Sequence, residues 1–260
     1  MMQTHSIPIV DAYPIYDNTS PISDAVPLNP INDFTNNNNN KNNNKNKNIF
    51  IKNTFSILLL QLSITFTGCA LSIYNKPVII EFINHYNGVI FIPMITMTFS
   101  LIFLMCCSKN KSVKYVMFTI FTLSSTGILS IVTIRYNTYI ILQAITSTCV
   151  ITGCISIYAY TCAKRGISFG EWEPYLFILV IALIISGIFQ IFIMSTILNT
   201  IIGLIGTIVF SGYLLYDVNQ LYLNEDKYSD DPIICAINIY LDIINIFMYI
   251  IQCLECGNRD

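Results

Sequence analysis

Two aspartates interrupt the most apolar stretches of the second half of the chain. Asp217 lies in GYLLYDVNQL, residues 212–221, and Asp242 lies in NIYLDIINIF, residues 238–247. If these stretches are membrane helices, an aspartate near their centre costs roughly 2.5–3.5 kcal/mol, and such residues mark proton or ion pathways. Asp242 follows Ile233 by nine residues, about 13 Å of helix, so it is expected to be deeply placed. Asp217 has a second interpretation, as a residue at a helix end whose carboxylate reaches the membrane interface.

The two aspartates are predicted to lie close together. They are 242 − 217 = 25 residues apart, with one short polar loop between their helices, so an antiparallel pair would bring them to similar depths. Two carboxylates at close range cannot both ionise cheaply, and they titrate as a coupled pair. Sharing a proton, they can hydrogen-bond and hold the helices together; ionised, they repel each other and attract a cation. The sequence therefore predicts a pH-dependent latch, a cation site, or both.

Each aspartate belongs to a polar stripe with helical spacing. The later stripe is Cys235, Asn238, Asp242, Asn245, Tyr249 and Gln252, and the earlier one is Gly203, Gly206, Phe210, Tyr213, Asp217 and Gln220. Steps of three and four residues place each set on one helix face. Polar faces must point into a bundle or a wet cavity rather than into lipid, and glycines allow helices to approach closely. We predict that four residues support the aspartates: Tyr213, Asn238, Asn245 and Tyr249.

The composition identifies the solvent around these stripes as lipid. The chain of 260 residues is 54% hydrophobic and 11% charged, with a mean hydropathy of +0.61. Soluble domains carry roughly 25% charged residues, so the class is an all-α integral membrane protein with the lipid bilayer as its first partner. The net charge of −2 gives no basic footprint for nucleic acid.

Seven stretches approach the roughly 20 apolar residues that a membrane span requires. They are residues 54–74, 88–107, 113–134, 139–161, 175–194, 197–221 and 233–253. The predicted membrane domain is residues 49–260, and its seventh segment is polar enough that a re-entrant segment is an alternative. Glu171, Trp172 and Glu173 suit an interfacial loop, with Trp172 at the level of the lipid headgroups.

Residues 1–48 are a separate region with five prolines, an asparagine run over 36–40 and an Asn/Lys mixture to residue 48. Such a segment buries too little apolar surface to offset its ordering entropy, so we predict a disordered tail. Basic residues of the tail and loops are concentrated in alternate segments, which by the positive-inside rule places the N-terminus in the cytosol.

Four stretches carry a resemblance to a known family. FSGYLLYDVNQL at 210–221 and AINIYLDIINIFMYIIQCL at 236–254 resemble the terminal signature of the Bax inhibitor-1 family. YIILQAITST at 139–148 and ISGIFQIFI at 185–193 are most similar to its Lifeguard and Golgi anti-apoptotic branch. The resemblance covers about residues 54–254.

The resemblance implies a seven-helix bundle, its last helix central, in a Golgi or endoplasmic reticulum membrane. It implies a pH-sensitive calcium leak that lowers store calcium and suppresses apoptosis, with calcium as the permeant ion and no cofactor. Asp217 and Asp242 match the paired aspartates that act as proton sensor and gate, so calcium would pass transiently near them without a firm metal site. Bacterial relatives pair these residues with an arginine of the second helix, but no arginine precedes Arg135 here. The latch would then rest on the shared proton alone, or on polar groups such as Thr96 and Thr98.

Two other classes of protein fit part of the pattern. A membrane scaffold could suppress cell death through other membrane proteins without ion flux, and it should tolerate Asp→Asn changes. An intramembrane aspartyl protease also pairs Tyr-Asp in one helix with an aspartate in the next, as at Tyr216–Asp217. Such proteases carry Gly-x-Gly-Asp at the second position, whereas Asp242 follows Tyr240 and Leu241. We therefore predict that the protein is not an enzyme.

Overall fold

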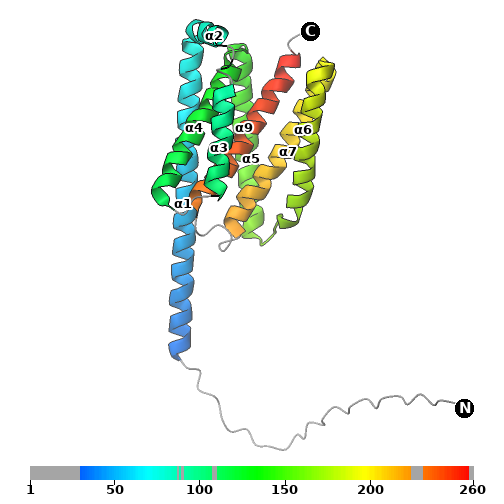
Figure 1. Ribbon diagram of the computed structural model, residues 1–260. Helices are drawn as coiled ribbons and strands as arrows, with labels where there is room; N and C mark the ends of the chain where they lie inside the picture. Colours follow the sequence, from blue (N-terminus) through cyan, green and yellow to red (C-terminus); the bar gives the residue numbers. More distant parts are fainter. Residues whose placement is uncertain (1–29, 87, 89–90, 107–109, 224–230, 258–260) are drawn as a thin grey trace, which may run out of the picture. The chain divides into compact units, whose positions relative to one another are not determined.

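The computed structural model describes residues 30–86, 88, 91–106, 110–223 and 231–257, and within these ranges all regular structure is helical. The elements, in chain order, are α1 (Pro30–Tyr74), α2 (Lys76–His85), α3 (Phe91–Cys106), α4 (Lys111–Thr133), α5 (Thr138–Lys164), the short 3-10 helix η1 (Gly170–Trp172), α6 (Glu173–Ile193), α7 (Thr196–Leu223) and α9 (Pro232–Gly257) (Figure 1).

The chain divides into two units, residues 1–42 and 43–260. The structure gives residues 30–48 as the first part of α1, where the composition predicted disorder, and residues 1–29 lie outside the described part. Proline suits the first helical position because its missing N–H would have no partner there. Once a helix has formed, each added residue contributes one backbone hydrogen bond. Even an Asn/Lys segment can therefore extend the helix.

Among the described residues, six helices of the second unit are long and apolar enough to cross a membrane: Lys45–Tyr74, Ser112–Thr133, Thr138–Lys164, Gly170–Ile193, Thr196–Leu223 and Pro232–Glu255. The expected second span corresponds to α3, whose 16 residues extend about 24 Å, against a hydrocarbon core of about 30 Å. The count of seven spans thus stays a prediction. The expected loop after the first span contains an additional short helix, α2, which has no buried residue.

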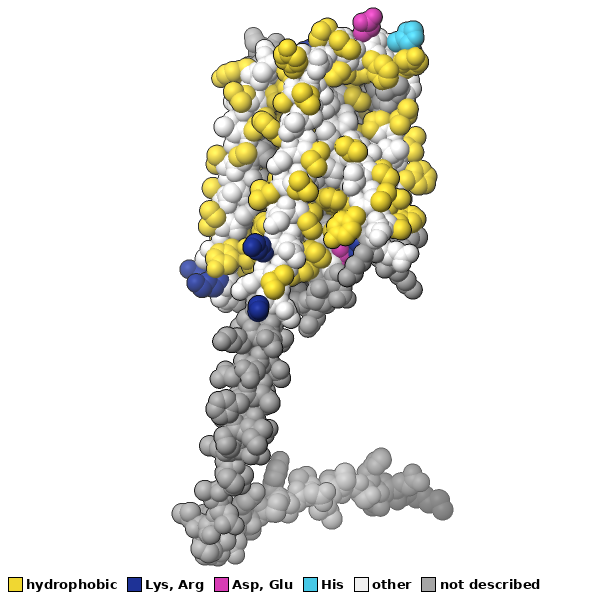
Figure 2. Space-filling view, turned by 90° about the vertical axis from the view of Figure 1, so that its left-hand side faces the viewer, with side chains coloured by type: hydrophobic (Ala, Val, Ile, Leu, Met, Phe, Trp, Pro, Cys, Tyr) yellow, Lys and Arg dark blue, Asp and Glu magenta, His cyan; other side chains and the backbone are white. Residues whose placement is uncertain are grey.

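The outer surface of the bundle is apolar. Large hydrophobic side chains are exposed along the helices, among them Leu59, Leu142 and Ile184. Figure 2 shows such side chains covering one face between the two ends of the bundle, with lysine and arginine side chains gathered at one end. This distribution is what a bilayer requires, and we describe the chain as a multi-pass membrane protein.

Of the six candidate spans, α9 has the largest buried share. This helix packs against α7 and α5. Through the fully buried Tyr240 it also contacts α4, since the Tyr240 and Phe121 rings meet edge to face with centroids 6.1 Å apart. A helix buried on several sides needs apolar residues all around except where polar groups find partners, and α9 has this composition.

Candidate functional site

Glycines bring α7 and α9 into close contact as an antiparallel pair. A Cβ atom built on Gly203 would lie 2.7 Å from Cys253 Sγ and 3.1 Å from the Tyr249 carbonyl oxygen. One built on Gly206 would lie 2.5–2.7 Å from three atoms of the Tyr249 ring. At the same end, the Gln252 side-chain amide donates to both the carbonyl and the side-chain oxygen of Asn199, at 3.0 and 2.7 Å. The pairing fixes the register that carries the aspartates.

In this register the carboxyls of Asp217 of α7 and Asp242 of α9 come close enough to interact. Two ionised carboxylates have no donor between them, so a hydrogen bond between the two side chains requires a proton on one of them. Asp242 is buried, and its Oδ2 atom has no hydrogen-bond partner among the described residues. Both aspartates line one cavity of about 630 Å³. Two carboxyls placed in this way can share a proton, and the cavity beside them is large enough for water or a small cation.

Three of the four predicted supporting residues, Tyr213, Asn238 and Asn245, line this cavity with the aspartates. The fourth, Tyr249, does not. Its ring stacks on Phe210 with centroids 5.7 Å apart and an interplanar angle of 23°, beside Gly206. The helical spacing placed Tyr249 on the correct face, but the close approach at Gly206 leaves its ring packed between the helices below the cavity.

Glu173 belongs to the same site although its sequence context indicated an interfacial loop. It is the first residue of α6, it lines the cavity, and its Oε2 accepts a hydrogen bond of 2.8 Å from the Tyr216 hydroxyl. Glu173 is exposed, whereas Tyr216 is buried. The one signal in the sequence was an acid in the first turn of a very apolar helix. Its proximity to residues more than forty positions later follows from the packing of α6 on α7.

Asn219 and Gln220, next to the first aspartate, hold the connection between α5 and α6. The fully buried Asn219 amide donates to the Ala159 and Ile167 carbonyls at 3.4 and 3.0 Å, and its Oδ1 accepts from the Phe169 N–H at 3.1 Å. Gln220 donates to the Ser168 hydroxyl at 3.4 Å, so it does not join the cavity. The polar residues of the DVNQL motif therefore have different contacts. Asp217 lines the cavity, while Asn219 and Gln220 anchor the connection that leads to Glu173.

The proposed substitutes for the missing arginine do not reach the aspartates. Thr96 Oγ1 lies 2.9 Å from Ser124 Oγ of α4, and Thr98 donates to the Met94 carbonyl of its own helix. Neither threonine lines the cavity of the aspartates. A basic residue does contact an acid just before α9: Lys114 of α4 forms an ion pair with Asp231, directly ahead of that helix.

A hydroxyl cluster joins α9 to α1 and α4. The Tyr240 hydroxyl lies 2.9 Å from Thr65 Oγ1 and 3.0 Å from Ser125 Oγ, and Thr65 Oγ1 lies 3.3 Å from Thr126 Oγ1. All four residues are buried. Sequence reasoning assigned no polar contact to Tyr240, because a tyrosine among isoleucines gives no sign of its partner.

Tyr240→Phe is expected to lower the free energy of unfolding by about 1 kcal/mol, the usual contribution of a buried hydrogen bond in a membrane or a soluble protein. The control is Tyr139→Phe, because Tyr139 is 69% exposed and its removal should change little. The measurement is an unfolding titration of the purified protein with a denaturing detergent. Equal effects of the two changes would contradict a role for the hydroxyl cluster.

The fold and the site together define a class: an all-helical multi-pass membrane protein whose last two described helices each bring a carboxyl to one cavity. The comparisons with known proteins agree with this class. Residues 47–260 match the family described as "Inhibitor of apoptosis-promoting Bax1". The chain belongs to this Bax inhibitor-1 family.

Several relatives match over most of their length. Protein LIFEGUARD 1 of Arabidopsis thaliana is 32% identical over 205 residues, covering 76% of this chain and 85% of the relative. Protein lifeguard 4 of Mus musculus is 28% identical, with 81% and 86% covered. The Golgi anti-apoptotic protein of Vaccinia virus (strain Lister) is 27% identical, with the same shares covered. The predicted resemblance to the Lifeguard and Golgi anti-apoptotic branch is thus confirmed.

Proposed function

We propose that this protein is a pH-sensitive calcium leak of an intracellular membrane, gated by Asp217 and Asp242, that lowers store calcium and suppresses apoptosis. The observation that carries the proposal is that these two carboxyls, on two helices that pack against each other, line one cavity inside a membrane bundle. An intramembrane pair that shares a proton must change its geometry when the proton leaves, because two adjacent buried charges repel each other. Such a pair is a two-state element that links pH to the contact between α7 and α9.

The cavity has the chemistry that a permeant calcium ion requires. Calcium takes oxygen ligands from carboxylates, amide carbonyls and water in a flexible geometry. Glu173, Asp217 and Asp242 supply carboxylates, while Asn238 and Asn245 bring side-chain amides to the same space. We place Glu173 at the more exposed part of the cavity and Asp242 at its buried part, so a cation would pass from one to the other without a firm metal site.

The remaining parts of the proposal concern the setting. The name Golgi anti-apoptotic protein supports suppression of cell death and a Golgi membrane, with the endoplasmic reticulum as the alternative membrane. The alternation of basic residues supports a cytosolic N-terminus. We further propose that α3 is the remaining one of seven spans, that α9 is the central helix, and that the protein works as a leak rather than as an enzyme, without a cofactor.

The test is calcium efflux from vesicles that contain the purified protein, measured over a series from mildly acidic to mildly basic pH. Wild-type flux is expected to exceed that of protein-free vesicles and to vary with pH. In Asp217→Asn and Asp242→Asn the carboxamide does not titrate, so the pH dependence should disappear. Asp231→Asn serves as control, since it removes an acid near the site that does not line the cavity.

The alternative is a membrane scaffold that inhibits cell death through protein partners. Folded wild-type protein that gives no flux above protein-free vesicles would favour this alternative. A scaffold should also keep its protective effect in cells when both aspartates are replaced by asparagine, whereas a leak gated by the pair should lose it.

A further inference from the structure

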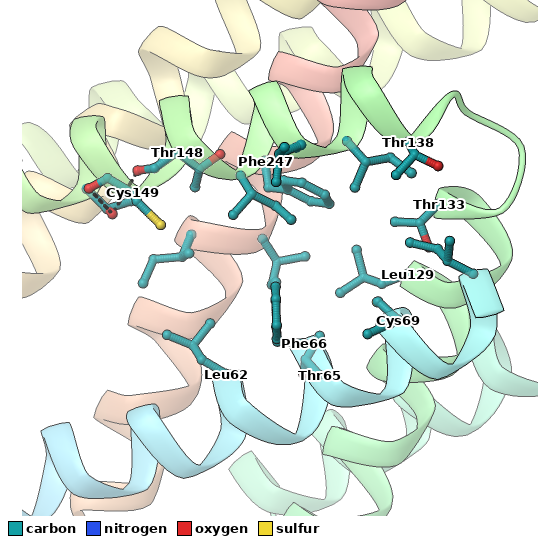
Figure 3. A pocket seen from close by; sticks show the side chains of 18 residues that line it. Leu62, Thr65, Phe66, Cys69, Leu129, Thr133, Thr138, Thr148, Cys149 and Phe247 are labelled. Carbon is teal, nitrogen blue, oxygen red and sulfur yellow. Dashed lines mark hydrogen bonds between the residues drawn. The ribbon is translucent and has the colours of Figure 1, made fainter.

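A second cavity, of about 360 Å³, lies away from the aspartates, between α1, α4, α5 and α9. Figure 3 shows its side chains converging from these four helices, with Leu62 and Phe66 on α1, Leu129 on α4, and Phe247 on α9. Its volume is in the range of about 300–1,000 Å³ that small-molecule sites occupy. The space is therefore large enough to hold part of a ligand.

The lining is apolar even where the sequence has threonines. Thr65, Thr133, Thr148 and Thr152 each donate their hydroxyl to a carbonyl of their own helix, at 2.8–3.1 Å. With the hydroxyls engaged in this way, the threonine methyl groups remain for contact with an occupant. Water needs two or more polar partners to stay in such a place, so this cavity suits a hydrocarbon group.

The cavity is open toward the bilayer. Its floor includes Leu129 and Ile141, which are 3% and 4% exposed, while Phe66 and Leu142 at its sides are 61% and 64% exposed. An empty groove in this position would forfeit the dispersion contacts that its lining atoms make in a packed environment. The material that surrounds these helices is lipid, so acyl chains have direct access.

The length of the cavity matches one leaflet. Along α5 its lining extends from Thr138 to Thr152, about 21 Å at 1.5 Å per residue, and along α1 from Leu62 to Ile73, about 16 Å. Half of a hydrocarbon core of about 30 Å is about 15 Å. The cavity begins at the first residue of α5, at the membrane surface, and ends near the middle of the bundle. A single acyl chain of one leaflet has this extent.

A positive charge stands at the surface end of the cavity. Arg135 lies in the connection between α4 and α5, and the residues on either side of that connection, Thr133 and Thr138, both line the cavity. Arg135 is exposed, and no carboxylate of the described residues forms an ion pair with it. Guanidinium groups bind phosphate oxygens in bidentate fashion, so the charge here complements a lipid phosphate.

We propose that this cavity is a binding site for one glycerophospholipid, with an acyl chain between α1 and α5 and the phosphate at Arg135. The site lies on the opposite side of α9 from the cavity of the aspartates, since Ile243, Ile244 and Phe247 face the lipid site while Asp242 and Asn245 face the other. The proposal stands independently of calcium flux.

The test uses the full-length protein in detergent with a phosphatidylglycerol probe that carries a photoreactive diazirine in its acyl chain. Adducts are mapped on peptides by mass spectrometry, and we expect them in residues 62–73 and 138–152. Ala70→Trp fills the cavity from an exposed position of its lining and should abolish these adducts. Ala182→Trp is the matched control, because Ala182 is exposed on α6 and does not line the cavity.

Arg135→Gln should weaken binding of the probe about two- to five-fold, the range expected for a charge pair at an exposed position. The control is Lys76→Gln, because Lys76 is also exposed and lies just after the end of α1. This change should leave binding of the probe unchanged. Unlabelled phosphatidylglycerol should compete with the probe, and oleate should compete poorly.

Three results would overturn the proposal. Adducts spread equally over α6 would show that lipid covers the whole surface without a site. Equal competition by oleate would make a fatty acid the occupant. A dimer in which Ala70→Trp prevents association would make a second copy of this chain the occupant.

Discussion

Gly206→Leu is expected to lower the free energy of unfolding by about 3 kcal/mol and to separate α7 from α9. The new Cβ atom alone would lie 2.5 Å from Cδ1 and 2.6 Å from Cγ of Tyr249. These atoms are on the side of the ring that is attached to the Tyr249 backbone. The ring also stacks on Phe210, so moving it away from the new side chain would cost free energy. Overpacking of a filled interface costs roughly 1–3 kcal/mol, and a leucine adds three more carbons beyond the Cβ.

Gly187→Leu is the matched control, because a Cβ atom on Gly187 of α6 would meet nothing within 4 Å. Leucine has a better helix propensity than glycine by up to about 1 kcal/mol, so this variant should be as stable as the wild type or more stable. Both are measured by titration with a denaturing detergent. Gly206→Ala should fall between wild type and Gly206→Leu.

A double variant tests the mechanism of this effect. If the clash with the Tyr249 ring causes the loss, Gly206→Leu should cost much less in a Tyr249→Ala background, and the two changes should not be additive. Additive effects would show that Gly206 acts through something other than this ring. In a functional assay, the same separation of α7 from α9 should disturb the carboxyl pair without any change to either aspartate.

Asn219→Leu is expected to lower the free energy of unfolding by about 2–4 kcal/mol and to release the connection between α5 and α6. The change keeps the side-chain size but removes three hydrogen bonds, and it leaves the Phe169 N–H and the Ile167 carbonyl without their partner. Each polar group left unsatisfied costs about 1–3 kcal/mol. Asn219→Asp keeps the acceptor for the Phe169 N–H and should therefore lose less than Asn219→Leu.

Limited trypsin digestion measures the release directly. Lys164 and Arg165 lie at the end of α5, next to the residues that Asn219 holds, so cleavage there should be faster in Asn219→Leu. Asn75→Leu is the control, because Asn75 is exposed and its side chain donates only to Leu71 of its own helix among the described residues. Unchanged cleavage in Asn219→Leu, alongside unchanged stability, would contradict the anchoring role.

The sequence alone was sufficient for the all-helical membrane class and for the family. Apolar composition and the length of each hydrophobic run determine that helices form and approximately where they begin and end, because lipid leaves the backbone no other way to satisfy its hydrogen bonds. The spacing of Asp217 and Asp242, on two helices joined by one short connection, already placed them at similar depths. Two consecutive helices joined by a short loop can pack against each other in few ways.

What the sequence could not determine is how helices distant in the chain pack against one another. Whether Glu173 meets Tyr216, whether Tyr240 reaches Thr65, and whether Tyr249 enters the cavity or stacks on Phe210 all depend on helix rotation and approach. Each helix face carries several polar residues, and periodicity does not say which neighbour each will meet. The helix-forming tendency of residues 30–48 was likewise hidden by their polar composition. Pattern therefore determined the elements and the carboxyl pair, while close packing at Gly203 and Gly206 decided the geometry around it, because steric fit depends on both surfaces at once.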